Sequence, residues 1–182
     1  MIRHPQELSL YRVFLNSFLT KPVWSNDGDV FVVKVGAGVI LTEGARVLLV
    51  RGSSTGYGLW TQPRGLWKEG ETTKDTAIRE CWEETGLKIR IRDIIAAIDL
   101  RVHRDDQTEQ ELFLSYSGEI VDDTELGPGA EIDEINWFPI EEALERTDVS
   151  TSTKIGIAKA TGRKIDINLK VQMKDALWEV IP

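Results

Sequence analysis

The chain has 182 residues, of which 41% are hydrophobic and 29% charged, a composition that suits one globular domain with a real core. Its 30 acidic and 22 basic residues give a net charge of −8, which excludes a general nucleic-acid coat because such a coat needs a basic surface. The chain has one cysteine, Cys81, and no long apolar segment. We therefore expect no internal disulfide, no membrane span and a cytoplasmic location.

The N-terminal segment is predicted to be a helical extension over residues 1–29. Apolar side chains recur at helical spacing within residues 5–19, and a turn-rich segment at 24–29 follows. The apolar face of this helix must cover either the main sheet or a second copy of the chain. The sequence therefore leaves a homodimer open.

The next segments are predicted to form a β-hairpin and then an irregular loop. Strands over residues 30–41 and 46–51 are rich in β-branched residues and flank a turn at Glu43-Gly44. Residues 53–71 contain four glycines and one proline and are predicted to be irregular. Arg51 ends the second strand where it points toward this loop, which makes it a candidate phosphate contact.

A helix is predicted over residues 74–85, with Thr72 or Thr73 as its N-cap and Gly86 as its stop. Later elements are predicted as strands at 87–92, 94–103, 110–119 and 135–140, an acidic loop at 121–134 and a short helix at Glu141–Arg146. Residues 148–182 are assigned to a C-terminal extension packed on the same domain. Strands with interspersed helices but no regular βαβ alternation predict an α+β fold, an α/β/α sandwich with a mixed β-sheet.

The predicted helix at 74–85 has two contrasting faces. Three carboxylates at i, i+3 and i+4 share one face, namely Glu80, Glu83 and Glu84. The other face is expected to pack on the sheet through Ala77, Ile78, Cys81, Trp82 and Thr85. A run of like charges is usually a solvated face; the alternative is a site for a hard cation, because Mg²⁺ and Mn²⁺ prefer oxygen ligands.

The residues around this helix favour the cation site. A glycine-rich loop at 65–70 leads directly to the helix, and glycine lets the backbone approach a ligand closely. Arg79 is adjacent to Glu80 and four residues before Glu83, where its guanidinium can hold a carboxylate. Glu71 adds an acid just before the helix begins.

Together these residues match the Nudix box, G-x5-E-x7-R-E-U-x-E-E-x-G-U, in which U is a bulky apolar residue. The matching positions are Gly65, Glu71, Arg79, Glu80, Cys81, Glu83, Glu84, Gly86 and Leu87. All seven fixed positions agree, and Cys81 is a soft match because a free cysteine behaves as a small hydrophobe. The chain thus resembles the Nudix hydrolases over about residues 30–147, which would form the Nudix domain.

The resemblance implies hydrolysis of a phosphoanhydride bond in a nucleoside diphosphate-linked substrate, such as a nucleoside triphosphate or a dinucleoside polyphosphate. By the family pattern, Mg²⁺ or Mn²⁺ is held by Glu80, Glu83, Glu84 and the backbone carbonyl of Arg64. Glu71 and Arg79 would be supporting catalytic groups. Glu83 or Glu84 would orient or deprotonate the attacking water; the alternative bases are Glu109, Glu111, Glu125, Glu131 and Glu134.

Three residues are candidates for substrate binding: Arg51, Trp60 and Arg64. Pro63-Arg64-Gly65 departs from the frequent Pro-Gly-Gly and resembles members that act on dinucleoside polyphosphates, so Arg64 either contacts an extra phosphate or faces solvent. Trp60 either stacks on a base or packs in the core. The expected partner is a small nucleotide, with an RNA 5′ end as the one nucleic acid left open. The alternative to an enzyme is a Nudix-fold module that binds without turnover.

Overall fold

The computed structural model describes residues 20–24, 30–52, 58–104, 107–123, 126–164, 171–173 and 176–180. The predicted helix at 5–19 lies outside the described residues, as does most of the predicted turn at 24–29. None of the helices in the described ranges has the length and apolar character needed to cross a membrane.

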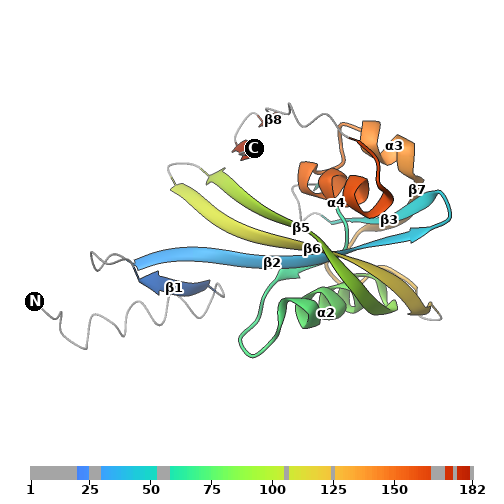
Figure 1. Ribbon diagram of the computed structural model, residues 1–182, viewed down its shortest axis with the longest axis horizontal. Coiled ribbons are helices and arrows are strands. Elements are labelled where there is room, and N and C mark those ends of the chain that lie inside the picture. Colours follow the sequence, from blue (N-terminus) through green and yellow to red (C-terminus); the bar gives the residue numbers. More distant parts are fainter. Residues whose placement is uncertain are drawn as a thin grey trace, which may run out of the picture.

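The described elements are mostly strands, with three helices among them (Figure 1). In chain order they are β1 (Thr20–Trp24), β2 (Val30–Glu43), β3 (Arg46–Arg51), β4 (Arg64–Leu66), α2 (Thr73–Thr85), β5 (Lys88–Arg104), β6 (Gln107–Asp122), β7 (Glu134–Pro139), α3 (Ile140–Glu145), α4 (Thr151–Thr161), β8 (Val171–Met173) and β9 (Ala176–Val180).

The strands in these ranges form one mixed sheet with the order β7-β3-β2-β6-β5-β9-β8, while β1 and β4 pair with β2 off this path. β2 and β6 run parallel, from Val33 beside Gln110 to Leu41 beside Gly118, and the other pairs are antiparallel. Helix α2 lies on one side of the sheet, and α3 and α4 lie on the other (Figure 1). The predicted α+β sandwich with a mixed sheet is confirmed.

Residues 36–41 of β2 are buried, and their side chains pack on both faces of the sheet. Val39 and Leu41 belong to an apolar cluster that includes Cys81 of α2. The intervening Ile40 joins the opposite cluster with Ile157 of α4. Because successive side chains of a strand point to opposite faces, a strand segment between two helical layers has an almost continuous apolar sequence, as residues 35–41 do.

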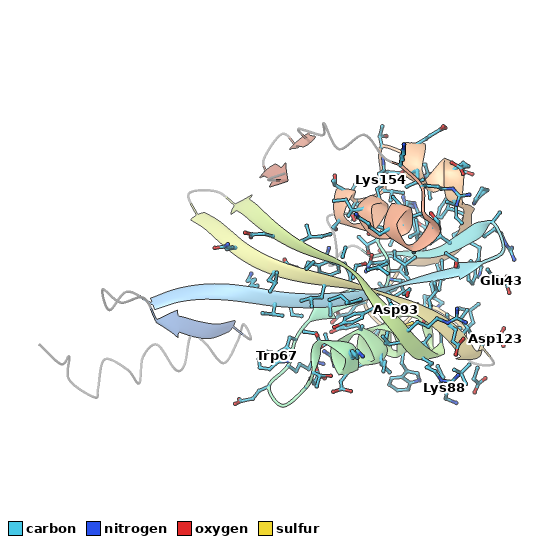
Figure 2. The ribbon with its side chains drawn as sticks, viewed as in Figure 1. Glu43, Trp67, Lys88, Asp93, Asp123 and Lys154 are labelled. Atoms are coloured by element: carbon cyan, nitrogen blue, oxygen red, sulfur yellow. The ribbon has the colours of Figure 1, made fainter. Side chains whose placement is uncertain are left out.

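Two predictions about the strands were wrong. Residues 87–92 and 94–103 are not separate strands but parts of β5, whose pairing with β6 shifts between Ile91 and Ile94 and again between Ile94 and Ala96. Asp93 lies at the first of these shifts and is part of the strand (Figure 2). The segment 53–71 is not wholly irregular either, since Arg64–Leu66 pair with Gly36–Gly38 as β4.

Candidate functional site

Helix α2 is fixed at its start by its own sequence. The Asp75 N–H donates to the Thr72 hydroxyl at 3.2 Å, and the Thr72 N–H donates to the Asp75 carboxylate at 3.0 Å. This reciprocal capping box satisfies two backbone donors that a helix start leaves free. At the other end Gly86 adopts φ +72° and its N–H donates to the Trp82 carbonyl at 2.8 Å. The predicted stop at Gly86 is confirmed, and of the two N-cap candidates Thr72 is the observed one, so the helix begins at Thr73, one residue earlier than predicted.

The loop that follows β6 holds the C-terminal end of α2. The N–H groups of Gly127 and Gly129 donate to the carbonyls of Thr85 and Glu84, both at 3.0 Å. A Cβ at Gly129 would overlap the Glu83 carbonyl, so the loop can lie this close only with glycine there. The sequence predicted the loop but not this contact, which fixes the backbone of both glutamates.

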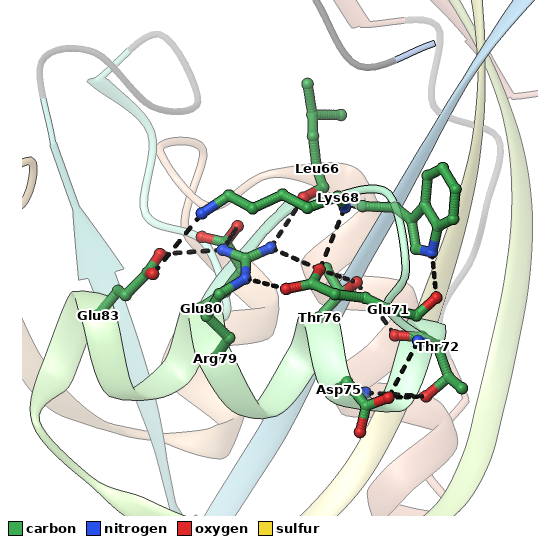
Figure 3. A network of polar contacts seen from close by, with 10 residues as sticks. Leu66, Lys68, Glu71, Thr72, Asp75, Thr76, Arg79, Glu80 and Glu83 are labelled. Carbon is green, nitrogen blue, oxygen red and sulfur yellow. Dashed lines mark hydrogen bonds and ion pairs between the residues drawn. The ribbon is translucent and has the colours of Figure 1, made fainter. Parts of the chain in front are cut away.

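Arg79 lies at the centre of a network of acidic side chains (Figure 3). Its guanidinium donates to both oxygens of Glu71, to Glu80, to Glu83 at 2.9 Å and to the Leu66 carbonyl at 3.0 Å. The hydrogen bonds from Arg79 lower the pKa of Glu71 from 4.5 to about 2. One arginine therefore ties the loop before α2 to two of the three clustered glutamates.

We expect Arg79→Lys to lower turnover about 10- to 100-fold, because a lysine cannot make the forked contacts that orient Glu80 and Glu83. Steady-state kinetics of the purified variant measures the effect. Arg146→Lys is the matched control, since Arg146 also grips two carboxylates, Glu142 and Asp148, but on the α3 side of the sheet. Equal activity of the two variants would contradict an orienting role for Arg79.

Glu80 approaches the backbone of β4 closely. A Cβ on Gly65 would overlap the Glu80 carboxyl group, so only glycine leaves room for this side chain. Burial raises the pKa of Glu80 above its ordinary value, although its contact with Arg79 acts in the opposite direction. The carboxyl is thus held in a site that penalises its charge unless a cation compensates it.

Glu84 is buried, with 6% of the residue exposed, and is not part of a solvated face. The Arg64 N–H donates to Glu84 Oε2 at 3.0 Å. Burial is the main reason that the pKa of Glu84 rises to about 8, and the charges of Glu80 and Glu131 add to the rise. In the described part of the chain Glu84 forms no ion pair with a lysine or arginine.

The predicted packing face of α2 was wrong at two positions. Ile78 is 38% exposed and Trp82 is 52% exposed, whereas Ala77, Cys81 and Thr85 are fully buried. The buried face of the helix therefore leaves out Ile78 and Trp82 and is rotated toward Thr76 and Glu84. The cause is tertiary: α2 contacts β4 as well as β2 and β5, and β4 covers the side where Glu84 lies.

The acidic group suits a hard divalent cation in charge and in donor chemistry. Glu71, Glu80 and Glu83 share the Arg79 guanidinium, and the Lys68 ammonium lies 3.6 Å from Glu83. With Glu84 beside them, the carboxylates outnumber these two cations, so negative charge is in excess. All the side-chain acceptors are carboxylate oxygens, the ligands that Mg²⁺ and Mn²⁺ prefer. Across the described ranges no three acidic, His or Cys side chains converge on one point, because Arg79 lies among Glu71, Glu80 and Glu83.

Arg51 and Trp60, two of the predicted substrate contacts, are joined to β7. Arg51 forms an ion pair with Glu134, and its guanidinium lies 4.8 Å from the centroid of the Trp60 ring. The Trp60 ring packs edge-on against Phe138 at 4.8 Å, and the residue is 4% exposed. Of the two roles that the sequence left open for Trp60, the structure favours core packing.

Arg64, the third predicted contact, has a half-buried side chain. Its guanidinium donates to the Ser152 hydroxyl at 3.3 Å and lies 4.6 Å from the centroid of the Phe113 ring. The nearest oxygen of Glu111 is 3.6 Å away. The solvent-facing alternative for Arg64 is therefore wrong, and its backbone lies at the carboxylate cluster while its side chain reaches α4.

Gln62 was not predicted from the sequence to have a role near β4. Gln62 is fully buried, its side chain exchanges hydrogen bonds with the Ser115 hydroxyl at 2.9 Å, and its N–H donates to Thr153 Oγ1 at 3.1 Å. These contacts tie the chain before β4 to β6 and α4. No spacing or charge pattern reveals them, because the partners are distant in sequence.

Comparison with known proteins points to the same family as the sequence motif. Residues 32–156 match the model of the NUDIX domain. The chain is 32% identical over 125 residues to Nudix hydrolase 6 of Arabidopsis thaliana, covering 63% of this chain and 41% of that protein. It is 38% identical over 73 residues to the RNA pyrophosphohydrolase of a Psychrobacter species, covering 40% of each. The matches thus span about two fifths of the length of these relatives.

Solved structures show the same fold. A NUDIX hydrolase from Nitrosomonas europaea superposes with a TM-score of 0.60 at 20% identity, covering 78% of this chain and 97% of that one. The binary complex of a C. elegans Ap4A hydrolase superposes with a TM-score of 0.58 at 19% identity, covering 71% and 96%. At these identities the likeness is one of fold.

Proposed function

Since the chain belongs to the NUDIX domain family, we propose that it is a hydrolase that uses Mg²⁺ or Mn²⁺ to cleave a phosphoanhydride bond in a nucleoside diphosphate-linked substrate. The observation that supports this most is the buried Glu84 carboxyl beside Glu80 at the backbone of β4, in a group with excess negative charge. A solvated acidic face would leave these side chains exposed. A divalent ion would compensate their charge.

We assign the ion to Glu80, Glu83, Glu84 and the backbone carbonyl of Arg64. When bound, the ion neutralises charge on the phosphate oxygens and acidifies a water molecule. Arg79 orients Glu80 and Glu83, and Glu71 in turn holds Arg79. Glu83 or Glu84 removes the proton from the attacking water. Glu131 is the alternative base, because its charge acts on Glu84 from the loop after β6.

The substrate classes that we propose are nucleoside triphosphates, dinucleoside polyphosphates and an RNA 5′ end. The positive charge of the Arg64 guanidinium favours a substrate with several phosphates. Two of the similar proteins, an RNA pyrophosphohydrolase and an Ap4A hydrolase, are named for substrates of these classes. We also propose a cytoplasmic location, which suits the single buried Cys81, and a homodimer formed through the apolar face predicted within residues 5–19.

The test is phosphate and pyrophosphate release from a panel of substrates with Mg²⁺ or Mn²⁺. The panel holds nucleoside triphosphates, dinucleoside polyphosphates, ADP-ribose, nucleotide sugars and a 5′-triphosphate RNA. We expect turnover of at least one polyphosphate class, and the preferred substrate identifies the leaving group. Binding without turnover of any substrate would replace the proposal with a Nudix-fold binding module.

The raised pKa of Glu84 leads to a prediction about stability and pH. Its folded pKa of about 8 lies above its ordinary value of 4.5, so the folded state binds this proton more tightly. The contribution is fully present below pH 4.5 and is lost as pH rises through 8. We expect the unfolding temperature in chelator to fall between pH 6 and pH 8.5, and Mg²⁺ to raise it more at the higher pH.

Thermal denaturation across this pH range measures the slope. Glu84→Gln removes the titrating group, so its slope over the same range should be shallower than that of the wild-type chain. An unchanged slope in this variant would show that another group is responsible.

A further inference from the structure

Two glycines of β2 open a furrow on the face of the sheet that packs against α4. Between them, Ala37 packs toward α2 with Ala77, so Gly36 and Gly38 face the other way. A Cβ on Gly38 would lie 2.7 Å from the Arg64 Cβ, and a Cβ on Gly36 would lie 2.8 Å from Glu111 Oε1. The furrow is thus the space that the two absent Cβ atoms leave, bordered by Pro63 and Gln62 and filled by the start of the Arg64 side chain from β4 and the carboxylate of Glu111 from β6.

The Arg64 guanidinium retains hydrogen-bonding capacity within this furrow. A guanidinium has five N–H donors, and among the described residues the one hydrogen bond from this group goes to the Ser152 hydroxyl at 3.3 Å. Its ion-pair distance of 3.6 Å to Glu111 is longer than a good hydrogen bond. Glu111 thus compensates the charge of Arg64, while most N–H donors of the guanidinium form no hydrogen bond with the described residues.

Glu111 depends on Arg64 for its own charge compensation. The residue is buried, and within the described ranges its ion-pair partner is Arg64. A carboxylate and a phosphate bind a guanidinium through the same oxygen geometry, and the phosphate carries more charge. A phosphate that enters the furrow can therefore replace Glu111, but the replacement leaves a buried carboxylate with less compensation.

We infer that Glu111 is an internal competitor for the phosphate that Arg64 binds, so that the pair selects substrates whose phosphate chain carries enough charge to displace a carboxylate. This inference rests on the proposed function and deepens it. In the resting protein Glu111 holds the guanidinium in the furrow. With substrate bound, a phosphate takes that place, and the cost of separating the pair lowers affinity most for substrates with short phosphate chains.

The test is Glu111→Gln, which keeps the size of the side chain and removes its charge. If the paired form is about 90% populated, its loss strengthens phosphate binding about 10-fold. We expect KM for the preferred polyphosphate to fall by about this factor. Calorimetric titration of metal-free protein with tripolyphosphate should show the same gain in affinity, and this readout does not need turnover.

Two controls separate this role from a general change of charge. Glu119→Gln removes a carboxylate from the same strand, where Glu119 pairs with Arg90 and Arg92, and should leave tripolyphosphate binding unchanged. In an Arg64→Gln background, Glu111→Gln should not change tripolyphosphate binding, because the guanidinium for which the carboxylate and the phosphate compete is then absent. If Glu111→Gln does not fold, Glu111→Asp weakens the pair by shortening the side chain and should give a smaller gain in the same direction.

Weaker tripolyphosphate binding by folded Glu111→Gln would overturn the inference, since it would mean that Glu111 positions Arg64 for the phosphate. A gain that persists without Arg64 would overturn it as well. If binding tightens as expected but no substrate is hydrolysed, the competitor role stands and the proposed hydrolysis fails.

Discussion

Replacing Glu83 with glutamine is expected to lower turnover by at least ~10²-fold while the fold stays intact. The variant keeps the side-chain volume and one acceptor oxygen but loses the negative charge that we assign to the divalent ion. Glu83 is on the exposed side of α2, where it contacts Arg79 at 2.9 Å and Lys68 at 3.6 Å. Exposed pairs of this kind contribute about 0–1 kcal/mol, so the unfolding temperature should change little.

The matched control is Glu142→Gln. Glu142 is also an exposed helical glutamate with an arginine four residues away, and Arg146 donates to it at 3.0 Å. It belongs to α3, on the opposite side of the sheet from α2 (Figure 1). We expect normal turnover from this variant. Near-normal turnover from folded Glu83→Gln, measured under saturating Mg²⁺, would refute the metal assignment.

Gly65→Ala should also reduce turnover, by about 10²-fold, because a displacement of about 1 Å in a catalytic group can cost that much. The added Cβ would overlap the Glu80 carboxyl group, which must then move away from the backbone of β4. Overpacking of this kind also destabilises a protein by about 1–3 kcal/mol. Steady-state kinetics and titration of Mn²⁺ binding report whether the loss follows the displaced ligand.

Gly70→Ala separates displacement of Glu80 from backbone strain. Gly70 has φ +90° and nothing within 4 Å of an added Cβ, so the substitution strains the backbone without touching a carboxylate. We expect lower stability but nearly unchanged Mn²⁺ affinity. If Gly65→Ala binds Mn²⁺ as tightly as Gly70→Ala, then Glu80 does not serve the ion.

The sequence predicted local features of the site well because their causes are local. An N-cap at Thr72 or Thr73 and a stop at Gly86 depend on residues within one helical turn, and the structure has Thr72 as the N-cap and Gly86 as the stop. The contact of Arg79 with Glu83 follows from their spacing of four residues on one helix. The mixed sheet between helices followed from the family resemblance and from the order of strand and helix patterns.

The failures share a different cause, which is contact between segments distant in sequence. Periodicity assigned Trp82 to the packed face of the helix and Glu84 to the exposed face, and the structure reverses both. The helix is rotated because β4 and the loop after β6 pack beside Glu84, and no helical pattern contains that information. In the same way, the sequence was divided into strands at 87–92 and 94–103, because the register shifts that let β5 continue across Asp93 depend on its pairing with β6.

The role of the two glycines of β2 was also invisible in the sequence. Gly36 and Gly38 read as residues of a buried strand, where glycine usually weakens pairing. Both glycines leave space for neighbouring side chains, because β4 and β6 pair with β2 and bring Arg64 and Glu111 to the positions that a Cβ would fill. Close packing of this kind depends on strand register, which composition does not determine.

The need for a divalent ion at the α2 carboxylates is tested most directly by the initial rate of phosphate release from the preferred substrate as Mg²⁺ is added to chelator-treated protein. We expect no measurable turnover before the addition and a saturable rise with Mg²⁺ or Mn²⁺. Turnover that is unaffected by the chelator would contradict this expectation, because the carboxylates of α2 would then act without the ion that their burial and charge require.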